Sequence, residues 1–293
     1  MSVWSEEVTA MSKLLYAGFA RLRHDTCFWV ILLVMAAIGV ILPVSSYHTM
    51  QYMRQFSDYV YEIPLENSFT SYIPLIVIFS AAFCSLFIGT EYSDGTIRNK
   101  IMIGHRRTDI YLSNLIVCFA AECIICLAFI VANLCAGIPL LGFFQCGLGI
   151  ILGYAGCAFV LCAAVTAIYT LIAMLSQNKA VSAVICTLGI IFMIFGGAYM
   201  NAQIEEPEFW DAYTYIDADG NIEESETMSN PNYIRGTKRV VYEFLNEFLP
   251  GNQTVLLGQG TAVHLWQMSL YSGVIAVIVT GVGIIFFCEE DIK

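Results

Sequence analysis

Few residues of this chain have the types and spacing that catalysis requires, and their arrangement argues against an enzyme. The four histidines, His24, His48, His105 and His264, are scattered and form no metal-ligand set. The sequence contains neither the G-x-x-x-x-G-K-[ST] motif that cradles nucleotide phosphates nor the H-E-x-x-H zinc motif. We therefore expect no catalytic residue, no metal and no cofactor in this chain.

One carboxylate, Glu122, lies in the middle of a long apolar run. Ionisable residues at membrane depth are costly, and they commonly mark a transport path or an ion-coupling site. Glu122 has no obvious intramembrane Lys or Arg partner, which weakens the ion-coupling interpretation. Two interpretations stay open: Glu122 lines a polar translocation path, or it is protonated against a neighbouring helix.

A short polar and basic segment, residues 89–113, lies between two apolar runs. Asp94 is a favourable N-cap and Gly104 a favourable C-terminal stop, so the sequence predicts a helix of about two turns near 94–104. Ile97 and Ile101 are four residues apart and would share one face of this helix.

The predicted short helix has the form of a docking element. An apolar ridge with basic flanks fits a groove on a cytosolic partner. A simpler interpretation, in which Arg106 and Arg107 only anchor the chain on the inner side of a membrane, is compatible with docking. The residues that we expect to dock are Asp94, Gly95, Ile97, Arg98 and Ile101.

Composition places the chain among polytopic membrane proteins. Of its 293 residues, 58% are hydrophobic and 13% are charged, whereas about 25% are charged in an average soluble domain. The apolar runs do not alternate with polar residues, so helices are expected rather than a barrel. We predict an all-α membrane protein whose six spans lie near 27–45, 70–90, 110–135, 148–175, 180–199 and 266–288.

The distribution of Lys and Arg predicts the orientation. With the N-terminus inside, nine of these residues fall in inner segments and four in outer segments. The even number of spans then places the C-terminus inside as well. The net charge of −11 argues against nucleic acid as a partner. We predict four regions: 1–26 cytoplasmic, 27–199 containing five spans, 200–265 extracytoplasmic, and 266–293 containing the sixth span and a cytoplasmic end.

The two regions outside the spans have different characters. Residues 9–25 read as a basic amphipathic helix on the inner membrane surface, or alternatively as an extension of the first span. The outer region 200–265 holds eleven Asp or Glu and three Lys or Arg. Within it we predict a turn in the segment 216–222 between two short extended pieces, and an apolar helical stripe from Val240 to Leu249 that ends at Pro250.

The eleven cysteines lie in or at the edges of the apolar spans. We interpret them as small packing residues. Cys135 and Cys146 flank a short outer turn and offer an alternative, a disulfide between them.

The basic segment is similar to the first cytoplasmic loop of ABC type-2 permeases, the membrane subunits of bacterial ABC exporters. The resemblance rests on Glu91–Lys100, on Gly104–Arg107 and on Ile110–Ser113, with weaker support from Met11–Leu22 and Asn230–Arg239. It implies six spans, an N-terminal elbow helix, and a coupling helix that rides on a separate cytosolic ATPase. It also implies a second permease copy or homologue in the bacterial cell membrane.

The resemblance makes an ATP-driven exporter of a peptide, lipid or drug-like substrate the first functional expectation. The alternatives are a membrane sensing or immunity module that binds a peptide at region 200–265, and an ion-coupled carrier that depends on Glu122.

Overall fold

Six long apolar helices account for most of the chain, in agreement with the all-α membrane fold that the sequence predicts. The computed structural model describes residues 2–56, 62–212, 214–216, 222–224 and 227–290. The long helices are α2 (Thr26–Met53), α4 (Tyr72–Ser93), α6 (Arg107–Leu141), α7 (Leu148–Ser176), α8 (Lys179–Glu205) and α11 (Leu265–Glu289). The short helix α3 (Leu65–Thr70) leads directly into α4. Helices α2, α6 and α8 run several residues beyond the predicted spans, because a helix need not end where the hydrocarbon ends.

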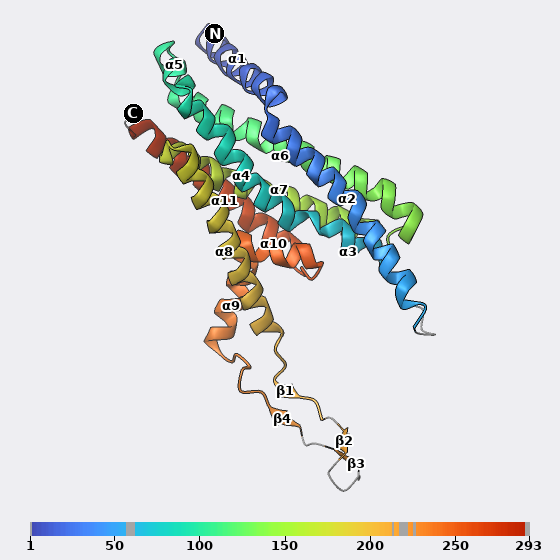
Figure 1. The fold of residues 1–293 in the computed structure, drawn as a ribbon. Coiled ribbons are helices and arrows are strands. Elements are labelled where there is room, and N and C mark those ends of the chain that lie inside the picture. The colour runs from blue at the N-terminus through green and yellow to red at the C-terminus, as the bar shows by residue number, and fades with distance from the viewer. Residues whose placement is uncertain (1, 57–61, 213, 217–221, 225–226, 291–293) are drawn as a thin grey trace.

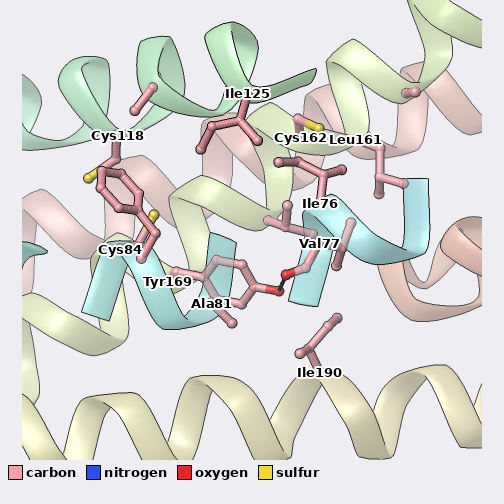
Figure 2. Packing of buried hydrophobic residues seen from close by; sticks show 14 of the residues in the cluster. Ile76, Val77, Ala81, Cys84, Cys118, Ile125, Leu161, Cys162, Tyr169 and Ile190 are labelled. Atoms are coloured by element: carbon pink, nitrogen blue, oxygen red, sulfur yellow. Dashed lines mark hydrogen bonds between the residues drawn. The ribbon is translucent and has the colours of Figure 1, made fainter. Parts of the chain in front are cut away.

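Helices α4 and α7 form the centre of the bundle. Each is largely buried, whereas α8 and α11 keep most of their surface exposed. Helix α4 packs against α7 and α8, and α7 packs against α11. In the core, Tyr169 of α7 donates a hydrogen bond of 2.9 Å to the carbonyl oxygen of Val77 in α4 (Figure 2). A second hydrogen bond joins the same two helices, from the Tyr92 hydroxyl of α4 to the carbonyl oxygen of Met174 in α7 at 2.6 Å.

Both chain termini lie at one end of the bundle, together with the short helix α5 (Thr96–Met102) (Figure 1). The N-terminal helix α1 (Ser2–His24) packs on α6 at this end. Asp25 separates α1 from α2, and its side chain accepts a hydrogen bond of 2.8 Å from the backbone N–H of Phe28. This N-cap satisfies a donor at the start of α2 and fixes the change of direction between the two helices.

The opposite end carries a small strand extension that points away from the helices (Figure 1). Strand β1 (Phe209–Trp210) pairs antiparallel with β4 (Met228–Ser229), and β2 (Thr214–Ile216) pairs antiparallel with β3 (Ile222–Glu224). The two predicted extended pieces are therefore present. Residues 217–221, within the predicted turn, lie outside the described residues.

The region after the strands differs from the prediction of one helix stopped by Pro250. Helix α9 (Thr237–Phe248) is present, but Pro250 begins a further helix, α10 (Pro250–Gln259). Proline is well suited to the first turn of a helix, because the backbone N–H that it lacks would have no intrahelical acceptor there. Helix α10 is buried from Pro250 to Leu257 and packs against α8, α4 and α7, so region 200–265 is not a simple outer loop.

Polar side chains make the burial of α10 possible. Asn252 donates to Asn246 of α9 at 3.2 Å, and Asn246 donates to Asn201 of α8 at 3.1 Å. Ser272 of α11 donates to Gln253 at 2.5 Å. The sequence 250–259 is short and partly polar, and these interhelical partners cannot be read from it.

All eleven cysteines are free thiols. The alternative of a disulfide between Cys135 and Cys146 is therefore not realised, and Cys135 is exposed on α6 while Cys146 lies in the following turn.

The close approach of α8 to α10 generates a test with an adjacent control. A Cβ on Gly197 would lie 2.8 Å from the Cα of Asn252, whereas a Cβ on Gly196 would meet nothing within 4 Å. Gly197→Ala is expected to lower the free energy of unfolding by about 1–3 kcal/mol through overpacking. Gly196→Ala gains the same helix propensity without the clash. Thermal unfolding of the two purified variants in detergent should separate them, and equal stabilities would contradict this packing.

Candidate functional site around Glu91 and helix α5

Helix α5 begins after a glycine whose backbone conformation few other residues adopt. Gly95 is its N-cap and has φ +68°, in the left-handed region that favours glycine. Asp94, which we expected to be the N-cap, instead ends α4, and its N–H donates to the carbonyl of Thr90 at 2.9 Å. The sharp reversal between α4 and α5 requires the left-handed residue, so glycine takes the cap position from aspartate. Gly104, with φ +99°, follows the end of α5.

The apolar ridge of α5 packs against the core of this chain. Ile97 is 1% exposed and belongs to the hydrophobic core, and Ile101 is half-buried against that core. The next two apolar residues, Met102 and Ile103, are 76% and 79% exposed. The i, i+4 pattern was therefore a signal for the buried face, which is what such a pattern indicates in most amphipathic helices.

A buried carboxylate, Glu91 on the last turn of α4, joins four helices. It is 3% exposed. Its Oε1 lies 2.5 Å from the Arg21 guanidinium of α1 and also forms an ion pair with the Lys100 ammonium of α5. Its Oε2 accepts a hydrogen bond of 2.9 Å from the side-chain amide of Asn114 in α6. We call Arg21, Glu91, Lys100 and Asn114 the Glu91 cluster.

Arg21 is held in place by more than charge. Its guanidinium carbon lies 3.7 Å from the centre of the Phe87 ring, one turn before Glu91 on α4. Its Nη2 also donates to the Asn114 side-chain oxygen at 3.4 Å. A planar cation stacked on an aromatic face keeps its edge free for the carboxylate. This arrangement fixes α1 against α4 and α6.

The cluster connects four helices through ion pairs and a hydrogen bond. One carboxylate is compensated by two cations and a neutral amide, and none of these groups is aimed at a nucleophile or a metal. Within the described residues no group of His, Cys, Asp and Glu has metal-binding geometry. Because a buried ion pair resists separation, a displacement of α5 would carry Glu91, and with it α4, α6 and α1.

Arg107 fastens the last helix to the same end of the bundle. Its Nη1 donates to the carbonyl oxygens of Phe287 and Cys288 at 3.1 Å each, and of Glu290 at 2.5 Å. These carbonyls end α11 and lack intrahelical donors. Arg107 therefore caps α11 from α6, a role that its interpretation as a charge anchor did not include.

Glu122, the other predicted site residue, lies elsewhere in the bundle. It is fully buried on α6, eight residues beyond Asn114, which is about 12 Å along a helix. Its carboxylate accepts hydrogen bonds from Thr166 of α7 at 2.6 Å and from the Cys84 thiol of α4 at 3.3 Å. Figure 2 shows Cys84 beside Cys118 in this part of the core. In the described part of the chain no Lys, Arg or His forms an ion pair with Glu122.

Sequence reasoning did not select Glu91, Arg21 or Asn114 as site residues. Glu91 is an acidic residue within the last turn of an apolar span, directly before a basic segment. An acid in that place needs a cation, and this requirement was the available signal. The partner Arg21 comes from a helix far away in sequence, so only the fold identifies it.

Comparison with known proteins gives one family. A family model described as an ABC-2 family transporter protein matches residues 14–196, more than half of the chain. The match contains the whole Glu91 cluster and helix α5, and it ends before the strand extension. Comparison with curated proteins gives no match.

Removal of the charge at Glu91 should weaken this end of the bundle. Glu91→Gln keeps the size of the side chain but leaves Arg21 and Lys100 without their counter-ion. We expect a loss of unfolding free energy on the order of 2 kcal/mol, below that of a fully buried pair because both cations keep some exposure. Faster amide exchange over 96–102 should accompany it.

The control for this variant is Asp94→Asn, which removes an exposed carboxylate three residues away. That change should alter the free energy of unfolding by less than about 0.5 kcal/mol. Equal effects of the two variants would show that the Glu91 cluster contributes no special stability.

Proposed function

The chain belongs to the ABC-2 transporter family, and from this premise we propose that it is the permease subunit of an ATP-driven exporter. In this proposal it moves a peptide, lipid or drug-like substrate out across a bacterial cell membrane. The observation that carries the proposal is the Glu91 cluster, which fixes α5 to the spans while the end of α5 stays exposed. A second permease copy would complete the pathway.

The energy source in this proposal is a separate cytosolic ATPase. These 293 residues contain no G-x-x-x-x-G-K-[ST] motif, which supports an ATPase that is separate from them. Both termini and α5 lie at one end of the bundle (Figure 1). The excess of Lys and Arg assigned to this end favours placing it in the cytoplasm.

We place the ATPase contact at the exposed end of α5. Two large apolar side chains, Met102 and Ile103, are exposed there, and neighbouring exposed apolar side chains often mark a protein interface. Of the residues expected to dock, Gly95 shapes the turn and Ile97 anchors α5 inside the protein. Ile101 lies half-buried between that anchor and the exposed pair.

Movement would pass from α5 into the spans by two routes. Ile97 is packed in the core, so a push on α5 meets the packed ends of α4 and α6. Lys100 is ion-paired with Glu91, so a pull on α5 meets a charge contact. Together these contacts would couple α5 to the spans both when α5 moves toward them and when it moves away.

A second candidate function, peptide sensing, is favoured by the strand extension. Phe209 and Trp210 on β1 are 51% and 44% exposed, and Met228 on β4 is 63% exposed. Exposed aromatic residues on paired strands suit the binding of an extended peptide. Substrate flux in proteoliposomes with the ATPase separates the candidates, because a sensor would stimulate ATP turnover without flux.

A charged pair at the end of α5 should break the ATPase contact. Met102→Asp with Ile103→Asp is expected to abolish co-purification with the ATPase and to stop transport, since two carboxylates replace the apolar surface. Met102→Leu with Ile103→Val keeps that surface and should preserve both. Membrane insertion should be unchanged in both variants, and retained co-purification of the Asp pair would contradict the assigned contact.

A substitution of Glu122 distinguishes ATP-driven transport from ion-coupled transport. Glu122→Gln preserves an acceptor for Thr166 but cannot release a proton. We expect ATP-driven flux within about two-fold of wild type, since the exporter requires no proton exchange there. Flux driven by a proton gradient without the ATPase, and lost in this variant, would support an ion-coupled carrier instead.

A further inference from the structure

A basic pocket beside α5 has no role in the proposed function. Its volume is about 530 Å³, and it lies between the end of α4, the side of α5 and the turn from α7 to α8. The charged side chains that line it are Arg98 of α5 and Lys179 at the start of α8. No carboxylate is among its lining residues.

The two cations of this pocket are not neutralised by the protein. Arg21 and Lys100 share Glu91, but neither Arg98 nor Lys179 forms an ion pair with any described residue. Both are exposed at the end of the bundle that holds the termini. Their charge is therefore available to an anion from outside the chain.

The position of Lys179 is set by tight packing. A Cβ on Gly89 of α4 would lie 2.7 Å from the Cα of Lys179, so the start of α8 lies directly against α4. The side-chain oxygen of Asn178 already accepts from the backbone N–H groups of Ala180 and Val181, at 2.9 and 3.2 Å. An anion in this pocket would thus be held by the Arg98 and Lys179 side chains rather than by these backbone amides.

An exposed apolar stripe on α8 starts at the pocket. Ala180 lines the pocket, and Val184, Leu188 and Phe192 follow at intervals of four residues, on the same side of the helix. These three side chains are 56%, 61% and 79% exposed. A basic end continuous with a long apolar track matches a molecule that has an anionic head and an apolar chain.

We propose that this pocket and stripe bind an anionic phospholipid of the leaflet on that side of the membrane. Its phosphate would lie between Arg98 and Lys179, and one acyl chain would lie along Val184 and Leu188. Basic pockets between membrane helices are suited to anionic head groups, and Arg can contact a phosphate through two N–H groups. The lipid would link α5 to α8. An acidic protein surface or a free phosphate would use the cations but leave the stripe without a role.

The test measures lipid binding by the full chain in detergent micelles, with native mass spectrometry as the readout. The probes are dioleoyl phosphatidylglycerol, phosphatidylcholine with the same chains, glycerophosphoglycerol, which is the head group without chains, and inorganic phosphate. We expect wild type to bind phosphatidylglycerol at least about ten-fold more tightly than the other three. Arg98→Gln with Lys179→Gln should weaken phosphatidylglycerol binding by about ten-fold or more, since each cation near an anionic lipid contributes about 1 kcal/mol.

The matched control is Lys13→Gln with Arg23→Gln, which removes two exposed cations from α1. This control should bind phosphatidylglycerol within about two-fold of wild type, and an equal loss in both variants would overturn the site in favour of general charge attraction. Comparable binding of glycerophosphoglycerol or inorganic phosphate would overturn the lipid in favour of a phosphate site.

The role of Arg98 in ATPase docking is the remaining rival. If the Arg98→Gln, Lys179→Gln variant loses co-purification of the ATPase while it binds phosphatidylglycerol like wild type, the pocket belongs to the protein interface and the lipid proposal fails. The binding assay contains neither ATPase nor nucleotide, so its outcome is independent of whether the exporter assignment holds.

Discussion

The Glu91 carboxylate constrains the whole end of the bundle that carries α5. A charge buried to this degree is tolerable only if cations and hydrogen-bond donors surround it. The chain supplies them from three other helices, with Arg21 from α1, Lys100 from α5 and Asn114 from α6. A shift of α1 or α5 away from α4 would leave a cation without its counter-ion, and a shift of α6 would remove the Asn114 hydrogen bond from Glu91. The energetic demand of one acid thus determines the geometry of four elements.

At the opposite end of the bundle, most of the buried polar side chains that need hydrogen-bond partners are neutral. Helix α10 is inserted among α4, α7 and α8, and its Asn252, Gln259 and Gln253 side chains pair with Asn246, Asn201 and Ser272 respectively. Neutral hydrogen bonds cost less to break than a buried ion pair, because no charge is left behind. The two ends therefore differ in kind. A charged cluster holds the end that carries α5, and hydrogen bonds between amide side chains hold the end that carries α10.

Sequence reasoning was most accurate where one strong physical requirement acts locally. Long apolar runs had to become spanning helices, and all six were predicted. It was least accurate where a residue's role depends on a distant partner. Ile97 and Ile101 carried an apolar pattern that cannot say whether the covering surface is the same chain or another one. Helix α10 was missed because its Asn and Gln residues are ordinary loop residues until other helices supply hydrogen-bond partners, such as Asn246 of α9 for Asn252 and the distant Asn201 of α8 for Gln259.

Gly95 forms the tight turn between α4 and α5, and the ion pair between Lys100 and Glu91 depends on this turn. A left-handed residue at the start of α5 turns the chain back at once, so that Lys100 reaches Glu91 only nine residues away. A longer connection would leave α5 free to rotate, and its movement would be absorbed in the linker. Ile97 and Lys100 hold one face of α5 against the protein, whereas Met102 and Ile103 are exposed at its C-terminal end. In the proposed exporter, a displacement of the exposed end of α5 would therefore pass to the spans, because packed interiors do not deform continuously.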